Sequence, residues 1–299
     1  MNILITGANG FVGKNLNSYL GVKHLVSNLS LRFEKPTDMN FNSDHIVHLS
    51  GKAHDLKKVS KPSDYYEANF ELTKRLFDAF VNSSAKKFIF VSSVKAASDS
   101  VGDVLTEDVV PNPGTHYGRS KLMAEEYIQS QKLPAGKSCY ILRPCMIHGA
   151  GNKGNLNLLY QLVKKRIPYP LAAFENKRSF LSVENLCFVI SELIERDDIK
   201  PGLYNVADDE ALSTNAVVSI LSTSLGNKPS LWRISPAVIK FLAKVGDKMH
   251  LPLTTERLNK LTENYIVSNK KIKEQLGHEL PLSATEGLIL TAQSFQQNK

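Results

Sequence analysis

A turn with three regularly spaced glycines at the start of the chain constrains its fold more than any other feature. The apolar run Ile3–Ile5 predicts a buried strand, and the pattern of Lys14–Leu20 predicts a helix. Gly7, Gly10 and Gly13 stand between and beside them. Glycines permit a sharp turn and a close backbone approach, and a helix N-terminus presents N–H groups to a phosphate. The turn therefore predicts a pyrophosphate site, although its spacing is G-x-x-G-x-x-G, and an ordinary strand-to-helix turn is the alternative.

The bulk composition narrows the classes of protein to which the chain can belong. A chain of 299 residues is long enough to bury a large core, in one domain or in two. Its 42% of hydrophobic and 22% of charged residues are typical of a soluble globular protein. No stretch of about 18 uninterrupted apolar residues occurs, and the N-terminus has no basic segment. We therefore expect neither a transmembrane segment nor a signal peptide.

Charge and cysteine content exclude further classes. The net charge of +8 comes without a dense basic run, so we expect no nucleic-acid partner and consider an anionic small substrate instead. The three cysteines, Cys139, Cys145 and Cys187, are few, scattered and odd in number. This pattern matches neither a disulfide framework nor a metal site. We therefore expect no metal, and a reducing, cytoplasmic compartment.

Strand-like and helix-like stretches alternate through the first half of the chain. Such alternation predicts an α/β fold with a doubly wound parallel sheet of the Rossmann type. Beyond Pro144 a glycine-rich loop follows, and the last third of the chain is mainly helical in pattern. The further strands that we expect are His24–Leu31, His45–Ser50, Lys87–Ser93, Cys139–Leu142, Ser179–Val183 and Leu203–Ala207. The further expected helices are Tyr65–Val81, Tyr117–Gln131, Asn155–Arg166, Leu186–Glu195, Thr214–Leu225, Pro236–Met249, Glu256–Leu261 and Asn269–Leu276.

The change of pattern predicts two domains. Residues 1–148 form an expected dinucleotide-binding Rossmann domain, to which residues 182–207 return, and residues 149–299 form a smaller, mostly helical C-terminal substrate domain. One helix of the second domain is apolar around Ile239, Phe241, Leu242 and Val245. A cap packed on the substrate domain is the commoner role for such a helix, and docking on a membrane or partner is the alternative.

The second expected strand bears on which dinucleotide is bound. In dinucleotide folds an Asp or Glu near the end of this strand holds the ribose hydroxyls of NAD, whereas a nearby Arg accommodates the 2′-phosphate of NADP. The stretch Ser27–Leu31 has no acidic residue, and Arg32 follows it before Glu34. NADP is therefore favoured over NAD as the cofactor, with a solvent-exposed Arg32 as the alternative.

Tyr117 and Lys121 lie four residues apart and share one face of the expected helix. A tyrosine phenol has an unperturbed pKa of about 10, and a fixed ammonium beside it favours the phenolate and lowers that pKa. The pair is suited to proton transfer at a sugar or alcohol oxygen while a hydride moves on the adjacent carbon. Ser93, at the end of an expected strand, can hold the same oxygen. The pattern Y-x-x-x-K also occurs by chance on solvent-facing helices. It indicates a catalytic pair here because the glycine turn and Ser93 accompany it.

Five motifs together carry a family resemblance. They are Thr6–Gly13, Ser92-Ser93, Tyr117–Lys121, Leu142–Pro144 and Arg178–Val183, in this order. The chain resembles an extended short-chain dehydrogenase/reductase of the nucleotide-sugar epimerase/dehydratase type over nearly its whole length.

Two further stretches, Ser92–Lys95 and Gly151–Asn155, look closer still to a bacterial subgroup of that family. Members of the subgroup act on UDP-N-acetylhexosamines as 4-epimerases, or as reductases of 4-keto-6-deoxy sugars, in O-antigen (lipopolysaccharide) or capsule synthesis. The resemblance therefore implies a UDP-linked sugar as substrate.

The resemblance also implies roles for individual residues. Ser93, Tyr117 and Lys121 form the implied catalytic triad. With Arg32, the expected cofactor-binding residues are Gly7, Gly10, Phe11, Val12, Gly13, Leu49, Ser50, Gly51, Asn69 and Pro144. The residues expected to bind the UDP-linked sugar are Lys95, Asn155, Arg178 and Arg257, of which Lys95 and Arg257 could equally be surface residues.

The chain also departs from the family pattern. Dehydratases of the family place an Asp-Glu pair directly after the catalytic hydroxyl, where this chain has Val94 and Lys95. No acid is therefore available to eliminate water, and dehydration is not expected. His116 replaces the usual proline before Tyr117, and the segment between the second and third expected strands is short.

These features predict an NAD(P)-dependent enzyme that acts at C4 of a UDP-linked, N-acetylated hexose, with or without its 6-hydroxyl. A 4-keto-sugar reductase is slightly favoured, because Arg32 is present and the second strand has no acid. The alternative is a 4-epimerase of UDP-N-acetylglucosamine or UDP-glucose with tightly bound NAD. A non-catalytic, NADP-sensing member of the fold is a third reading. We also expect a homodimer in which the helices Tyr65–Val81 and Tyr117–Gln131 pair.

Overall fold

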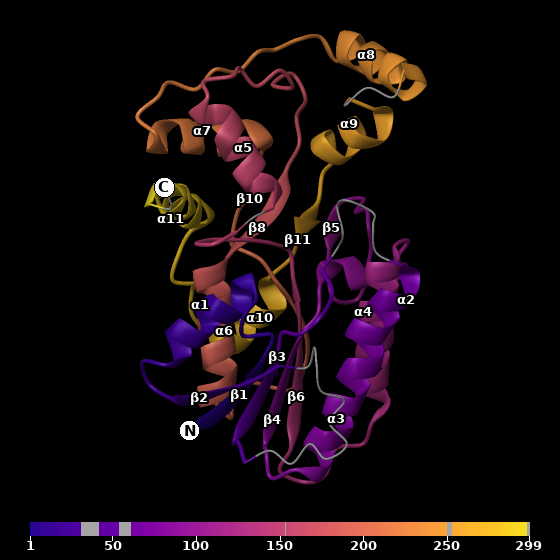
Figure 1. The fold of residues 1–299 in the computed structure, drawn as a ribbon, viewed down its shortest axis with the longest axis vertical. Coiled ribbons are helices and arrows are strands. Elements are labelled where there is room, and N and C mark those ends of the chain that lie inside the picture. The colour runs from indigo at the N-terminus through magenta and orange to yellow at the C-terminus, as the bar shows by residue number, and fades with distance from the viewer. Residues whose placement is uncertain (31–41, 54–60, 153, 250–252, 298–299) are drawn as a thin grey trace.

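A sheet of six parallel strands in the order β2-β1-β3-β4-β6-β9 forms the centre of the protein (Figure 1). The computed structural model describes residues 1–30, 42–53, 61–152, 154–249 and 253–297. The strands are β1 (Asn2–Thr6), β2 (Leu25–Leu29), β3 (His45–His48), β4 (Lys87–Val91), β6 (Ser138–Pro144) and β9 (Gly202–Val206). The chain order reverses between β1 and β3, and sheets of this kind bind ligands at the carboxyl ends of the strands on either side of such a point.

Helices cover both faces of the sheet, so the predicted doubly wound α/β fold is confirmed. One face is covered by α1 (Phe11–Leu20), α6 (Val183–Glu195) and α10 (Lys270–Leu276), and the other by α3 (Leu72–Asn82) and α4 (His116–Ser130). In β4, Ile89 and Val91 pack into the first core, whereas Phe88 and Phe90 pack into the second. Successive side chains of a strand point to opposite faces. A strand that is covered on both faces therefore has an uninterrupted apolar sequence.

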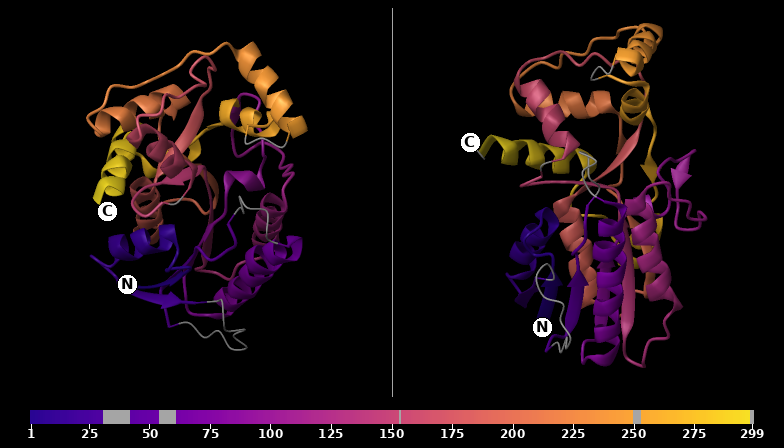
Figure 2. Two further views of the ribbon diagram at one scale, coloured as in Figure 1. Left: turned by 45° about the horizontal axis from the view of Figure 1, so that its top comes forward. Right: turned by 45° about the vertical axis from the view of Figure 1, so that its right-hand side comes forward.

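The C-terminal lobe lies beyond the carboxyl ends of these strands (Figures 1 and 2). We give this name to the three-stranded sheet β10-β8-β7 and five helices that share a core including Tyr160, Phe180 and Leu258. Its strands are β7 (Met146–His148), β8 (Arg178–Ser182) and β10 (Ala211–Leu212), and its helices are α5 (Asn155–Lys164), α7 (Thr214–Ser224), α8 (Pro236–Met249), α9 (Thr255–Thr262) and α11 (Ala284–Gln297). The division into domains at residue 148 remains a prediction.

Several elements were not expected from the sequence. The last helix, α11, is one of them, because the residues that it buries include Gly287 and Thr291, which weaken an apolar helical pattern. The expected single helix from Tyr65 to Val81 is observed as α2, a π-helical turn η1, and α3. The further short elements are α2 (Pro62–Tyr66), η1 (Glu67–Glu71), the 3₁₀ turn η2 (Val94–Ala96), β5 (Val104–Leu105) and β11 (Ile266–Val267).

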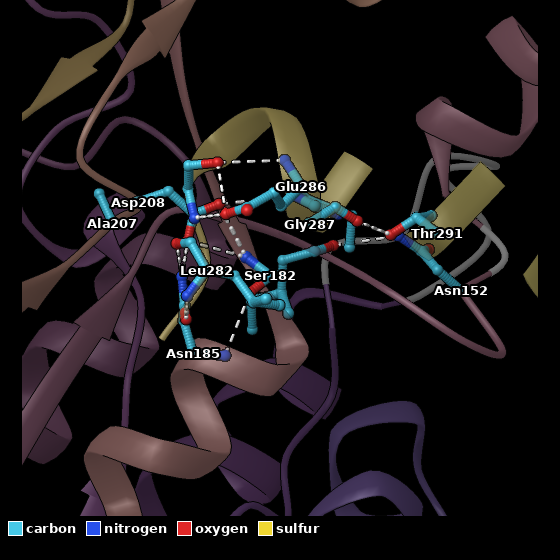
Figure 3. A network of polar contacts seen from close by, with 12 residues as sticks. Asn152, Ser182, Asn185, Ala207, Asp208, Leu282, Glu286, Gly287 and Thr291 are labelled. Carbon is cyan, nitrogen blue, oxygen red and sulfur yellow. Dashed lines mark hydrogen bonds and ion pairs between the residues drawn. The ribbon is translucent and has the colours of Figure 1, made fainter. Parts of the chain in front are cut away.

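A buried polar network joins the C-terminal lobe to the sheet (Figure 3). The carboxylate of Asp208, just after β9, accepts hydrogen bonds from the backbone N–H of Ser182 at 3.0 and 3.1 Å and from the amide of Asn185 at 2.7 Å. The side chain of Asn185 also donates to and accepts from the backbone of Leu282, which leads into α11. Because a buried carboxylate requires such partners, the network fixes the start of α11 against the sheet.

No helix in the described ranges of the chain is both long and apolar enough to cross a lipid bilayer.

The close packing of the glycine turn predicts that a side chain at Gly13 destabilises the fold. A Cβ at Gly13 would lie 2.2 Å from the carbonyl oxygen of Gly7, so either α1 or the turn must shift when alanine is introduced. We expect Gly13→Ala to lower the free energy of unfolding by about 1–3 kcal/mol. Gly102→Ala is the matched control, since a Cβ there meets nothing within 4 Å. Urea unfolding followed by circular dichroism measures both variants, and equal losses of stability would contradict the argument.

Candidate active site

The glycine turn joins β1 to α1 at the carboxyl edge of the sheet. Gly7 has a φ of +75°, in the left-handed region that favours glycine. A Cβ there would lie 2.8 Å from the backbone nitrogen of Ser50 and 2.9 Å from the carbonyl carbon of Leu49, so the turn packs on the segment after β3. The N-cap of α1 is Gly10, and among the residues that the structure describes no side chain caps this end of the helix. The N–H groups of residues 11–13 are therefore directed at a place where a phosphate can bind.

A buried histidine ties β1 to β3 behind this turn. The Nδ1 of His48 lies 2.6 Å from the hydroxyl of Thr6, and its Nε2 lies 2.9 Å from the hydroxyl of Thr73. The Thr6 hydroxyl also accepts a hydrogen bond from the backbone N–H of Ser50 at 3.3 Å. Burial, with a smaller effect of the Lys121 ammonium, lowers the pKa of His48 to about 3. The ring is therefore neutral at physiological pH and supports the turn without adding charge.

Asn69 connects the segment after β3 with helix α4. It lies in the π-helical turn η1, where its Oδ1 accepts from the backbone N–H of Lys52 at 2.7 Å and its Nδ2 donates to the hydroxyl of Ser120 at 3.0 Å. A Cβ at Gly51 would lie 2.6 Å from Asn69 Oδ1 and 3.3 Å from Lys121 Nζ. Since π-helical turns recur at functional sites, its place here is consistent with a role in binding.

Ser93, Tyr117 and Lys121 meet at the carboxyl end of β4. A side-chain hydrogen bond joins Ser93 to Tyr117. Lys121 lies one turn further along α4 and donates from its Nζ to the carbonyl oxygen of Val91, the last residue of β4, at 3.0 Å. The hydroxyl of Thr115 accepts from a backbone N–H in the first turn of α4 and so fixes where the helix begins. Strand, helix and cap together therefore hold three polar side chains in one place.

The electrostatics of Tyr117 differ from the prediction. The sequence predicts that the Lys121 ammonium lowers the pKa of Tyr117, but burial raises that pKa above 10.0, and the Glu125 carboxylate adds to the rise. The hydrogen bond to Ser93 opposes it. Burial also lowers the pKa of Lys121 from 10.5 to about 8, against an opposing effect of Glu125. The prediction is wrong for this structure because the cost of desolvation dominates and the Lys121 ammonium is bonded to Val91.

A buried ion pair beneath these side chains was missed by the sequence analysis. Arg143 Nε lies 3.0 and 3.1 Å from the two carboxylate oxygens of Glu125, and its Nη2 lies 2.5 Å from one of them. The two side chains are only 3% and 1% exposed, and the hydroxyl of Ser92 also donates to the carboxylate. One signal was available, because Glu125 follows Lys121 by four residues and Tyr117 by eight, on the same face of the helix.

Two of the predicted substrate-binding residues lie between the sheet and the C-terminal lobe. Lys95 Nζ donates to the carbonyl oxygen of Asp99 at 2.9 Å and lies 4.1 Å from the ring centroid of Tyr265. Arg178, at the start of β8, donates to a backbone carbonyl of α9 at 2.7 Å and pairs with Glu263 at 3.4 Å. Burial lowers the pKa of Lys95, the charges of Asp99 and Glu263 oppose this shift, and the charge of Arg178 adds to it. The structure therefore places these two cations near each other.

The structure describes some of the remaining predicted site residues and not others. Arg32 lies outside the described residues, as does the side chain of Asn155, whose backbone begins α5. Arg257 is exposed on α9, where its backbone N–H donates to the hydroxyl of Thr254 at 3.3 Å. Pro144 is the last residue of β6 and so lies at the same edge of the sheet as the glycine turn.

Comparison with known proteins assigns the family. The profile of the NAD dependent epimerase/dehydratase family matches residues 3–207. The chain belongs to this family. A UDP-glucose 4-epimerase of Vibrio cholerae is 30% identical over 99% of this chain and 96% of its own length. An Escherichia coli O157:H7 relative, an N-acetyl-alpha-D-glucosaminyl-diphospho-ditrans,octacis-undecaprenol 4-epimerase, is 27% identical over 98% of this chain and 94% of its own length.

A solved structure shows the same fold. MoeE5 in complex with UDP-glucuronic acid and NAD superimposes with a TM-score of 0.78 over the whole of both chains, at 18% identity. Relatives of the chain include 4-epimerases of a nucleotide-linked and of a polyprenol-linked sugar, and a nucleotide-sugar reductase from Pseudomonas aeruginosa. The chain is therefore an NAD(P)-dependent enzyme of the epimerase/reductase type.

The site itself fits a nicotinamide dinucleotide. The start of α1 and the glycine turn can hold a pyrophosphate, because within the described part of the chain no side chain caps this end of the helix. Lys121 and Tyr117 lie at the carboxyl end of β4, two strands from β1 in the same sheet. A dinucleotide that binds at the glycine turn can therefore extend across the strand ends toward them.

The buried ion pair predicts a strong stability effect that depends on both partners. Glu125→Gln or Arg143→Met leaves one charge buried without its partner, and we expect each to lower the free energy of unfolding by about 3–5 kcal/mol. The double variant removes both charges and should lose clearly less than the sum of the two single variants. Urea unfolding of all three variants measures this coupling. Additive losses would show that the two side chains do not stabilise each other.

Proposed function

We propose that this enzyme transfers hydride and a proton at C4 of a UDP-linked, N-acetylated hexose. The observation that carries the proposal is the meeting of Tyr117, Ser93 and Lys121 at the strand ends beside the glycine turn. Neither Val94 nor Lys95 offers the carboxylic acid that dehydration needs, which supports chemistry confined to C4.

Tyr117 is the group that exchanges the proton with the C4 oxygen. Ser93 and Tyr117 are joined by a hydrogen bond. A sugar oxygen placed between them can therefore accept a hydrogen bond from each of the two hydroxyls. The Lys121 ammonium supplies positive charge at this end of α4, and this charge opposes the desolvation that disfavours the phenolate. Thr115 and the Glu125–Arg143 pair hold the helix in place and act as positioning residues.

The cofactor supplies the hydride acceptor and donor when it is bound. Gly7, Gly10 and residues 11–13 would hold its pyrophosphate, and Leu49–Gly51 would line its adenosine side. Asn69 and Pro144 would lie near the nicotinamide half, because both are at the same sheet edge as Lys121.

The UDP diphosphate would bind between the sheet and the C-terminal lobe. Lys95 and Arg178 supply two neighbouring cations there, and an arginine fork bonds phosphate oxygens in pairs. Asn155 and Arg257 are the further predicted contacts. Arg178 would have to exchange its bond to Glu263 for the diphosphate, so we expect α9 to shift when substrate binds.

A 4-epimerase is the outcome that the relatives support best, since the two full-length relatives described above are both 4-epimerases. In this case the cofactor is NAD and stays bound while the 4-keto sugar turns over. A 4-keto-sugar reductase is the second candidate. It is favoured by β2, which carries no acidic residue that could hold the ribose hydroxyls of NAD.

The nucleotide released from the purified, denatured protein distinguishes the two outcomes. Stoichiometric NAD, together with interconversion of UDP-N-acetylglucosamine and UDP-N-acetylgalactosamine, would support the epimerase. A protein that is purified without nucleotide and oxidises added NADPH only with a 4-keto sugar would support the reductase. A protein that binds a dinucleotide but converts neither the UDP-N-acetylhexosamines nor the 4-keto sugar would support the non-catalytic hypothesis.

The role of Tyr117 can be tested by removing one hydroxyl. We expect Tyr117→Phe to lower the turnover rate by about 10²–10⁴-fold, because the proton loses its carrier. Tyr127→Phe is the matched control on the same helix, since its hydroxyl bonds Asp78 instead. Circular dichroism of both variants checks the fold. Equal activity of Tyr117→Phe and the wild type would contradict the proposal.

The pKa of Lys121 predicts the alkaline limb of the pH profile. Since its folded-state pKa is about 8, the ammonium is charged below pH 8 and neutral above it, so activity should fall as pH rises through about 8. Lys121→Arg stays protonated and should lose this limb, at a lower overall rate. The measurement is kcat/KM against pH for both proteins. A limb of unchanged position in Lys121→Arg would assign the titration to another group.

The predicted homodimer remains a separate proposal. Helices α3 and α4 lie together on one face of the sheet, and Met123 on α4 is 38% exposed. Sedimentation velocity of the wild type and of Met123→Lys would test whether this face mediates pairing.

A further inference from the structure

Helix α8 has a second apolar face in addition to the one that packs on the protein. Ile239, Ala243 and Gly246 are buried and form one stripe along the helix, and the first two belong to the core of the C-terminal lobe. The large apolar residues that α8 exposes are Val238 (49%), Phe241 (66%), Leu242 (48%) and Met249 (65%). Because each helical residue turns by about 100°, these four occupy an arc beside the buried stripe. The apolar surface of α8 is thus wider than its packing requires.

A row of lysines borders the exposed apolar arc. Lys240, Lys244 and Lys248 follow one another at intervals of four and are all exposed. The segment from residue 226 to residue 249 contains five basic residues and one acidic residue, Asp247, whose carboxylate bonds the backbone and hydroxyl of Thr255. This segment is therefore strongly basic. A basic row beside an apolar arc is the pattern of helices that lie in a membrane interface.

The position of α8 leaves this face accessible. It projects at the far end of the C-terminal lobe from the sheet and packs on α9 (Figures 1 and 2). The helix that it packs on also holds Arg178, through the carbonyl oxygen of Lys260. Helix α9 thus contacts both α8 and one of the cations that we assign to the substrate diphosphate.

We propose that α8 docks the protein on a lipid bilayer that contains anionic headgroups. The helix has 14 residues and is about 21 Å long, too short for a hydrocarbon core of about 30 Å, so it lies in the plane of the interface. Phe241 and Leu242 enter the headgroup–acyl boundary, and the three lysines contact lipid phosphates.

Charge complementarity favours an anionic bilayer over a second copy of the chain as the partner of the α8 face. A symmetric pairing through α8 would bring the same lysine row of each copy close together, which like charges oppose. A neutral protein partner would not use the lysines at all. The proposal does not depend on the substrate or reaction assigned above.

Vesicle sedimentation tests the proposal directly. We expect the wild-type protein to sediment with vesicles of phosphatidylcholine and phosphatidylglycerol and to stay in the supernatant with phosphatidylcholine alone. Binding should weaken at least about tenfold when salt rises from about 50 mM to about 500 mM, because the lysine contacts are screened. Failure to bind the anionic vesicles at low salt would overturn the proposal.

Matched variants locate the contact. Phe241→Ser with Leu242→Ser, and separately Lys244→Glu with Lys248→Glu, should each lower binding at least about tenfold. The controls alter other exposed residues elsewhere, Val22→Ser with Leu158→Ser and Lys86→Glu with Lys132→Glu, and should bind as the wild type does. Equal losses in test and control variants would assign binding to general charge or apolarity and overturn the assignment to α8.

Fluorescence reports insertion independently of sedimentation. Trp232 is the only tryptophan of the chain, so Trp232→Phe combined with Phe241→Trp moves the single indole onto α8. Its emission should shift to the blue with anionic vesicles and be quenched by brominated lipids. An unshifted emission in a sample that sediments with the vesicles would overturn insertion of α8. A wild-type dimer that Phe241→Ser with Leu242→Ser dissociates would instead assign the face to a second copy.

Discussion

The parallel alignment of all six central strands is the constraint on which the rest of the structure depends. Because every strand runs in the same direction, residues that follow β1, β3, β4 and β6 arrive at one edge of the sheet. The glycine turn, the segment after β3, Ser93 and Pro144 meet there although up to 137 residues of chain separate them. The apolar strands are buried on both faces, so this edge is where polar groups can face a ligand. The position of the site thus follows from the topology of the sheet.

Buried polar groups hold that edge in shape. His48 stays neutral between two hydroxyls, which allows it to join β1, β3 and α3 without a charge in the core. Burial raises the pKa of Glu125, while its hydrogen bonds to Arg143 and Ser92 oppose the rise, and the charge of Glu125 also acts on Lys121. The Glu125 carboxylate opposes the loss of the lysine charge, while burial promotes that loss. The pKa values of Tyr117 and Lys121 therefore reflect a balance between desolvation and a neighbouring carboxylate, so the ion pair belongs to the candidate site.

The C-terminal lobe carries the residues to which we assign substrate binding and membrane docking. Its α9 holds Arg178, and its α8 exposes an apolar and basic face at the far end of the molecule. The network around Asp208 and Asn185 fixes the lobe to the sheet. A membrane-bound α8 would orient the whole enzyme, because the lobe and the sheet share this junction.

Local sequence determined much of this protein. The glycine turn, the uninterrupted apolar strands and the Tyr117–Lys121 spacing each reflect a requirement of the backbone or of one helix face, and such requirements can be read within a few residues. Tertiary structure decided the rest. Helix α11 was missed because its buried face uses Gly287, which packs closely on Ser182, and Thr291, whose hydroxyl lies 2.8 Å from Nδ1 of His148. The pKa of Tyr117 went against the prediction because desolvation depends on everything packed around a group and not on its neighbour in sequence. The pairing of Glu125 with Arg143 likewise joins a helix to a strand, a contact that exists only once β4 and β6 are side by side.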